Sequence, residues 1–315
     1  MRIVKVNKDS IANILSDLLK RSPTNYGDFQ DKVDAIIKNV RDNGDKAVFD
    51  YTAQFDKAEI NAENILVTEE EIKEAYEEVD DELIKVIRKA IKNIRDFHEK
   101  QIQKSWFETR EDGVMLGQKV TPMETCGVYV PGGKAVYPSS VLMNIVPAHV
   151  AGVKNIIMTT PPGKDGKVTA NTLVAAKEAG ATKVYKVGGA QAIAAMAFGT
   201  ESIPKVDKIV GPGNIFVALA KKAVYGNVSI DSIAGPSEIL VVADETANPR
   251  YVAADLLSQA EHDELASAIL VTTSEKLAHE VSNQVDGFLK ELSRAEIISK
   301  SLDNYGYILL ADTME

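Results

Sequence analysis

The feature that most restricts the fold of this chain is a regular alternation of short apolar runs with helical stretches between residues 126 and 230. Alternation of this kind is typical of right-handed βαβ units around a parallel sheet. The predicted strands are residues 126–130, 155–159, 183–187, 208–210 and 228–230, and the predicted helices begin near Ser139, Thr169, Gly189 and Asn214.

A second alternation follows Gly235, which indicates two α/β units rather than one long sheet. Its predicted strands are residues 239–243, 268–272 and 307–310, with helices from Asn248 and Glu275. Upstream, apolar residues at three- and four-residue spacing predict amphipathic helices over residues 10–19, 29–55 and 69–103. Residues 113–122 alternate and end at a proline, which suits a strand or hairpin.

Charge density places a boundary near Thr121. Asp, Glu, Lys and Arg together number 25 in residues 61–120 and only 8 in residues 121–180. A drop of this size indicates that a solvated helical layer gives way to a buried sheet.

Composition excludes several classes of function. The net charge of −10 has the wrong sign for a chain that grips nucleic acid or an anionic membrane surface. Cys126 is the single cysteine, so an intrachain disulfide and a cysteine-based zinc cluster are both excluded. The sequence has neither an apolar core of signal-peptide length near its start nor an apolar stretch long enough for a membrane span. We therefore expect a cytoplasmic protein with small-molecule partners.

The last residues indicate a segment that continues. Asp312 with Glu315 three residues later resembles the capping box that opens a helix. No helix follows, so we expect that a C-terminal part is missing; the alternative is a frayed polar tail.

Three glycine-rich turns follow predicted strands, at the edge of a parallel sheet where ligands bind. Each turn alone could be a simple connector, but three in one unit favour a nucleotide-sized cleft. The G-x-G-x-x-G and P-loop fingerprints are absent. The three turns are residues 131–133, 188–189 and 211–214.

Three further residues are candidates for substrate or metal binding. Ser237, in a turn before the strand at 239–243, could donate to a substrate or only bond its own backbone. Gln259 and His262 lie three apart on the helix predicted from Asn248, and such a pair can share a metal. Spacing alone favours a solvated helix end for this pair, because glutamine is a weak ligand and acidic residues flank His262.

The sequence resembles the histidinol dehydrogenase family over essentially all of its length. The stretches that carry the resemblance are GVYVPGGKAVYPSSVLMN, KVGGAQAIAAMAFGTESIPKVDKIVGPGN, DSIAGPSEILVVAD and LLSQAEHD, in the family's order. The resemblance implies a zinc- and NAD-dependent enzyme that oxidises L-histidinol through the aldehyde to L-histidine, the final step of histidine biosynthesis. It also implies a homodimer.

Residue roles follow from the matched motifs. Tyr129, Gln191 and Asn214 resemble the family's NAD-contacting positions, Ser237 its substrate-contacting serine, and Gln259 with His262 the two zinc ligands that also lie against the substrate. The family's adjacent Glu-His acid/base pair and its remaining zinc ligands come after Glu315, so no catalytic residue is assigned here. We therefore expect the 315-residue chain to be inactive or severely impaired.

The fold expected from these observations and the resemblance is α/β, with two Rossmann-like parallel-sheet domains of the aldehyde dehydrogenase-like class and a helical N-terminal region. The expected boundaries are an N-terminal arm at 1–23, a discontinuous first domain at 24–122 with 237–315, and an inserted NAD-binding domain at 123–236. Two alternatives stay open: an aldehyde dehydrogenase-like enzyme with Cys126 as nucleophile, and a non-catalytic nucleotide-binding module. Burial and the lack of a nearby basic residue in the sequence disfavour Cys126 as a nucleophile.

Overall fold

A computed structural model describes residues 1–6, 12–14, 16, 27–132, 138–233 and 238–313. The chain forms two compact units. The larger unit is residues 27–233, and the smaller unit combines residues 1–26 with residues 234–315. The helix predicted over residues 10–19 falls mostly outside the described residues.

The larger unit is built on a five-stranded parallel sheet in the order β6-β5-β4-β7-β8. Its central strand β4 aligns Cys126 with Ile156 on one side and with Lys208 on the other. All five strands predicted between residues 126 and 230 are confirmed. They are β4 (Thr125–Tyr129), β5 (Asn155–Thr160), β6 (Lys183–Lys186), β7 (Lys208–Val210) and β8 (Ser229–Ile230).

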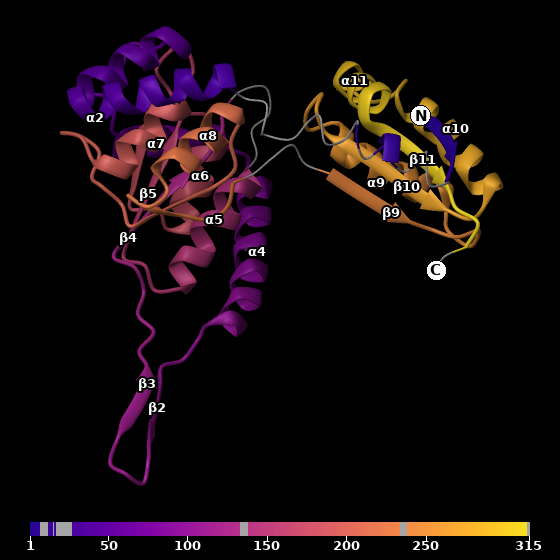
Figure 1. Ribbon diagram of the computed structural model, residues 1–315. Coiled ribbons are helices and arrows are strands. Elements are labelled where there is room, and N and C mark those ends of the chain that lie inside the picture. The colour runs from indigo at the N-terminus through magenta and orange to yellow at the C-terminus, as the bar shows by residue number, and fades with distance from the viewer. Residues whose placement is uncertain (7–11, 15, 17–26, 133–137, 234–237, 314–315) are drawn as a thin grey trace. The chain divides into compact units, whose positions relative to one another are not determined.

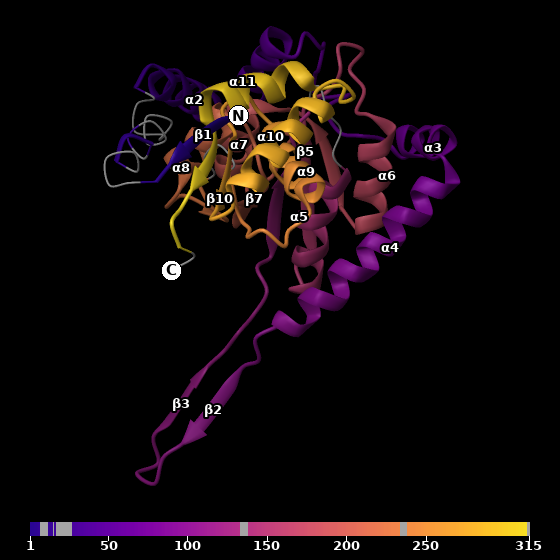
Figure 2. The same cartoon turned by 90° about the vertical axis from the view of Figure 1, so that its right-hand side faces the viewer.

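Helices cover both faces of this sheet in two layers each. From the centre of the sheet, β4, β5 and β6 follow one another toward one edge, and β7 and β8 follow one another toward the other edge. Right-handed crossovers therefore put the helices that connect the two sets of strands on opposite faces. The helices α5 (Pro138–Val150) and α6 (Ala170–Ala179) pack together, as do α7 (Gly189–Phe198) and α8 (Ile215–Val224). Figure 1 shows α2 (Gly27–Phe55) over α7 and α8, and Figure 2 shows α3 (Glu69–Glu78) and α4 (Asp81–His98) beside α5 and α6.

Two of the predicted long helices are interrupted. The stretch predicted as one helix over residues 69–103 is α3 and α4 followed by the short 3-10 helix η2 (Glu99–Gln101). The break between α3 and α4 arises because Val79 is extended and the Asp80 carboxylate accepts from the Glu82 N–H, which starts a new helix. Within α2, Gly44 has a φ of 56°, which produces a kink.

The two compact units group the N-terminal helices differently from the expected domains. Those boundaries group residues 24–122 with residues 237–315, whereas α2, α3 and α4 lie in the same compact unit as the five-stranded sheet. The reason is the shared core: Ile84 and Ile87 of α4 are buried in one cluster with Val141 and Ile145 of α5.

The smaller unit has a four-stranded parallel sheet in the order β1-β11-β10-β9, and helices α9, α10 and α11 pack against it. Its predicted strands are confirmed, as is the helix start at Asn248, whose side chain accepts from the Arg250 N–H. The strand β1 and the helix α11 were not predicted. The bounds are β1 (Arg2–Lys5), β9 (Glu238–Val242), α9 (Pro249–Ala260), β10 (Ser267–Thr272), α10 (Glu275–Phe288), α11 (Ala295–Tyr305) and β11 (Gly306–Leu310).

The chain after β11 is described only to residue 313, so the expected capping box lies partly outside the described residues. Asp312 forms an ion pair with Lys5 at 3.6 Å.

The predicted hairpin is an exposed arm of the larger unit. The strands β2 (Trp106–Thr109) and β3 (Met115–Gln118) pair antiparallel, and every residue in them is exposed. Figures 1 and 2 both show the hairpin projecting away from the helices of its unit. Among the described residues, no helix combines the length and apolar character that a membrane crossing requires.

Candidate functional site

The strand order of the larger unit creates a ligand-binding edge. The central strand β4 lies between β5 and β7, and the chain connections leave β4 and β7 toward opposite sides of the sheet. At such a switch point the carboxyl ends of the two strands are left open to a ligand. Tyr129 ends β4 and Gly211 directly follows β7, so both lie at this opening.

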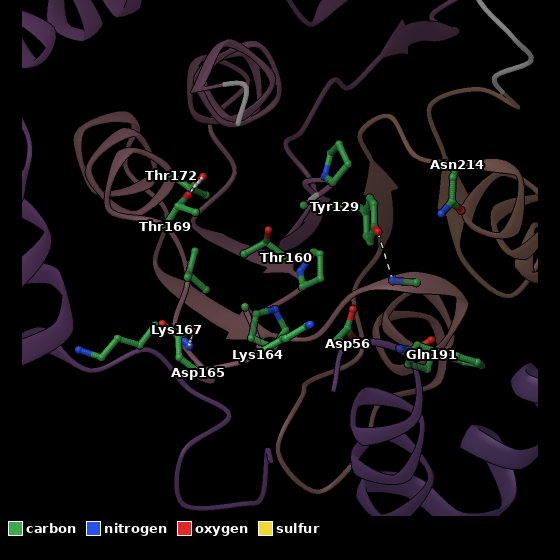
Figure 3. Close-up of a pocket in the computed structure, with 18 of the residues that line it drawn as sticks. Asp56, Tyr129, Thr160, Lys164, Asp165, Lys167, Thr169, Thr172, Gln191 and Asn214 are labelled. Carbon is green, nitrogen blue, oxygen red and sulfur yellow. Dashed lines mark hydrogen bonds between the residues drawn. The ribbon is translucent and has the colours of Figure 1, made fainter. Parts of the chain in front are cut away.

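A cavity of about 1080 Å³ lies at this edge of the sheet, as Figure 3 shows. Its wall includes the first turns of α6, α7 and α8, which direct the positive ends of three helix dipoles toward the cavity. Such an arrangement favours an anionic ligand. The cavity also brings together Tyr129, Gln191 and Asn214, the three residues that the sequence motifs assign to the cofactor.

Tyr129 is fixed in the wall of the cavity by its hydroxyl group. Its side chain is 3% exposed, and its hydroxyl oxygen accepts a hydrogen bond of 3.2 Å from the Gly189 N–H. Burial raises the pKa of Tyr129 to about 12; the Gly189 hydrogen bond opposes this shift, and the negative charge of Asp56 adds to it. The hydroxyl group is therefore protonated at neutral pH and can donate to a ligand.

Gln191 stands out because its amide has no protein partner. The residue is 1% exposed, and among the described residues neither its Oε1 nor its Nε2 has a hydrogen-bond partner. A buried unsatisfied polar group costs about 1–3 kcal/mol. Gly189 makes room for this amide, because its φ is 66° and a Cβ there would lie 2.6 Å from Gln191 Oε1. The amide therefore has both a donor and an acceptor unsatisfied by the described residues.

Asn214 begins α8 at the far side of the same cavity. Its Oδ1 accepts from the N–H groups of Phe216 at 3.1 Å and Val217 at 3.2 Å. This cap uses the amide oxygen, which leaves the NH₂ group of Asn214 for a ligand.

A buried ion pair supports the loop that carries Asn214. The ammonium group of Lys221, whose side chain is 3% exposed, pairs with Asp231 and donates to the Gly211 carbonyl oxygen at 2.9 Å. Asp231 in turn accepts from the Gly211 N–H at 2.9 Å. Both backbone polar groups of Gly211 are therefore held by charged side chains.

The sequence interpretation missed two residues of this site. Lys221 is one, because a lysine in the last turn of a helix normally reads as a solvated residue. Asp56 is the other: it follows α2, far from the glycine turns in sequence, yet lines the same cavity. The sequence offered no signal for Asp56 beyond a polar residue at the end of an amphipathic helix.

The other predicted site residues belong to the smaller unit. Ser237 lies outside the described residues. Gln259 is half-buried on α9, but this helix ends at Ala260, so the expectation that His262 shares it is wrong: His262 lies in the following turn, where its N–H donates to the Gln259 carbonyl oxygen at 3.2 Å. The part of the chain that the structure describes holds no group of three or more His, Cys, Asp or Glu that could bind a metal ion.

Cys126 lacks the properties of a catalytic nucleophile. It is 4% exposed inside the sheet, and burial raises its pKa to about 11 despite the nearby charge of Lys208. A thiol with this pKa is protonated at neutral pH and reacts slowly.

Comparisons with known proteins place the chain among its relatives. Residues 19–315 match the protein family described as histidinol dehydrogenase. The chain is 55% identical to the histidinol dehydrogenase of Halalkalibacterium halodurans and 57% identical to that of Bacillus subtilis. It covers 72% of the length of each, and these alignments include 100% and 99% of the present chain.

The chain belongs to the histidinol dehydrogenase family. A crystal structure of histidinol dehydrogenase from Elizabethkingia anophelis gives a TM-score of 0.92 at 40% identity, covering 100% of this chain and 71% of that one. The mixed α/β architecture with parallel sheets is thus the architecture of the histidinol dehydrogenase family, whose members are oxidoreductases.

Proposed function

We propose that this chain carries the NAD-binding part and a portion of the substrate site of a histidinol dehydrogenase. The reaction is the NAD-dependent oxidation of L-histidinol through L-histidinal to L-histidine, the final step of histidine biosynthesis, in the cytoplasm. The observation that supports this most directly is the convergence of Tyr129, Gln191 and Asn214 on one cavity at the switch point of a parallel sheet.

The residues present suit NAD. The unpartnered amide of Gln191 requires a polar ligand, and three helix N-termini suit the negative charge of a pyrophosphate. Gly211 allows a close approach, because its φ is 115° and a Cβ there would overlap the Tyr129 carbonyl oxygen. NAD, when bound, supplies the acceptor for the hydride that leaves the alcohol carbon.

The chain's own side chains bind and orient. Tyr129 keeps its proton on Oη, so it donates a hydrogen bond without adding charge to the site. Gln191 can both donate and accept, and the NH₂ group of Asn214 donates from the opposite wall. Because Tyr129 and Gln191 are buried, bonds to them are shielded from water and are stronger than at the surface.

The proposed substrate and zinc residues belong to the smaller unit. Ser237, Gln259 and His262 are proposed to contact L-histidinol, with Gln259 and His262 also as zinc ligands, by resemblance alone. Two ligands do not complete a zinc site, and the described residues supply no cluster that fits. A partner subunit in a homodimer and residues outside this chain are the proposed sources of the other ligands and of the acid/base pair.

The 315-residue polypeptide alone is expected to oxidise histidinol at least about 100-fold more slowly than a full-length relative, because general acid/base groups contribute about 10²–10⁴ in rate. NADH formation followed by absorbance, with the Bacillus subtilis enzyme assayed in parallel, measures this difference. Comparable rates would contradict the expected impairment.

NAD affinity measured with and without zinc separates the enzyme from the nucleotide-binding module, for which NAD binding should be normal in both conditions.

Gln191→Leu tests the proposed cofactor site. We expect NAD affinity to fall at least about 10-fold, because a lost hydrogen-bonding amide costs more than about 1 kcal/mol. We expect the unliganded Gln191→Leu chain to melt at a higher temperature, because leucine replaces a buried amide that has no hydrogen-bond partner among the described residues. Isothermal titration calorimetry and thermal unfolding measure the two effects.

Gln54→Leu is the control for this experiment, since Gln54 is exposed on α2 and does not line the cavity. Unchanged NAD affinity in Gln191→Leu would refute the proposed role of the amide. Absence of NAD binding by the unsubstituted chain would refute the proposed function itself.

A further inference from the structure

Asp56 is a second residue of the cavity with a buried polar atom that has no partner among the described residues. It lines the cavity with Tyr129 and Gln191, and its Oδ2 is buried with no hydrogen-bond partner among the described residues. Burial raises the pKa of the Asp56 carboxyl group to about 6, so the group is still mostly ionised above pH 7. An ionised carboxylate can only accept hydrogen bonds, so its natural ligand is a pair of donors.

Hydrogen bonds fix the backbone around Asp56 at the end of α2. The Asp56 N–H donates to the Thr52 carbonyl oxygen at 2.9 Å, which continues the last turn of α2. Lys57 then adopts a φ of 60°, and its ammonium group donates to the Gln54 carbonyl oxygen at 2.7 Å. A left-handed conformation costs a lysine about 1–2 kcal/mol.

The neighbours of Asp56 indicate which part of a dinucleotide it meets. Figure 3 shows Asp56, Tyr129 and Gln191 around the start of α7, and the charge of Asp56 acts on Tyr129. The helix N-termini of the cavity suit the pyrophosphate, and the groups next to a pyrophosphate in NAD are the two riboses. Each ribose presents two adjacent hydroxyl groups, which are the pair of donors that one carboxylate can accept.

We propose that Asp56 binds the vicinal hydroxyl groups of one ribose of NAD and is a cofactor-binding residue of this chain. The inference rests on the proposed function. It adds to the site a residue that directly follows α2 and lies outside the glycine-turn motifs.

The test compares Asp56→Asn with the unsubstituted 315-residue chain by isothermal titration calorimetry at pH 7.5. We expect NAD affinity to fall about 10- to 100-fold, because hydrogen bonds to charged groups contribute about 1.5–3 kcal/mol. Asp50→Asn is the matched control: it removes the same charge a short distance along the chain, but Asp50 is exposed on α2 and does not line the cavity. We expect this control to change NAD affinity less than about 3-fold.

Two NAD analogues identify the ribose: one lacks the hydroxyl groups of the adenosine ribose, the other those of the nicotinamide ribose. The effect of Asp56→Asn should disappear with one analogue and persist with the other, because deleting either partner removes the same bond. An equal effect on NAD and both analogues would overturn the inference, as would unchanged NAD affinity.

Thermal unfolding separates a binding role from a structural one. If Asp56 is held for a ligand, Asp56→Asn should raise the melting temperature of the unliganded chain at pH 7.5, because it neutralises a half-buried carboxylate whose buried Oδ2 has no hydrogen-bond partner among the described residues. A lower melting temperature would assign Asp56 a structural role and overturn the inference. Absence of NAD binding by the unsubstituted chain refutes the proposed function, whereas NAD binding that Asp56→Asn leaves unchanged refutes only the role of Asp56.

Discussion

Gly211→Ala is expected to lower the free energy of unfolding by about 2–5 kcal/mol and to abolish measurable NAD binding. Gly211 has a φ of 115°, a conformation that an alanine adopts only with strain of about 1–2 kcal/mol. The added Cβ would also overlap the Tyr129 carbonyl oxygen, and overpacking against rigid backbone costs about 1–3 kcal/mol more. Relief of this overlap must displace the loop that carries Asn214, one of the proposed NAD contacts. Urea unfolding and calorimetry measure the two losses.

Gly226→Ala is the matched control for this substitution. Gly226 has a similar φ of 101°, but no atom lies within 4 Å of the position a Cβ would take. It therefore reports the cost of the backbone conformation alone, about 1–2 kcal/mol, and should leave NAD affinity unchanged. Equal losses of stability in the two variants would show that the approach of Gly211 to Tyr129 is unimportant.

Lys221→Met is expected to lower the free energy of unfolding by about 2–4 kcal/mol and to weaken NAD binding. Methionine fills a similar volume, but it leaves Asp231 without its cationic partner and the Gly211 carbonyl oxygen without its donor. Removal of one member of a fully buried ion pair costs about 3–5 kcal/mol. The cost is smaller here because Asp231 is 32% exposed and water can solvate part of its charge. Urea unfolding measures the loss.

Two further variants check the explanation for Lys221. Lys222→Met changes the exposed neighbour on α8 and should alter stability by less than about 0.5 kcal/mol. The double variant Lys221→Met with Asp231→Asn should recover part of the lost stability, because no buried charge is then left unpaired. Additive losses in the double variant would mean that the ion pair is not what supports the loop.

Local patterns in the sequence were sufficient to predict most of the architecture. Apolar runs such as residues 155–159 are strands because a strand buried on both faces needs a continuous apolar segment. The glycine turns were predictable because Gly189 and Gly211 adopt φ values that other residues rarely take. Capping residues were also informative: Asn248 and Asn214 begin α9 and α8 as predicted.

Several features could not be read from local patterns. The break between α3 and α4 depends on an extended Val79 inside an otherwise helical pattern. The strand β1 is only four residues long and pairs with β11 at the other end of the chain, so nothing near it in sequence indicates its partner. The grouping of α2, α3 and α4 with the five-stranded sheet depends on which apolar faces meet, and the periodicity of a helix does not specify its partner.

The sequence by itself determined the alternation of strands and helices, the family, and three candidate cofactor residues, Tyr129, Gln191 and Asn214. These follow from local conformational preferences and from motifs that are contiguous in the chain. The tertiary structure alone decided that the three residues line one cavity, because the order of strands in a sheet is set by long-range pairing. It also brought Asp56, which directly follows α2, to this cavity and placed Lys221 beneath Gly211, since both positions depend on how helices pack on the sheet.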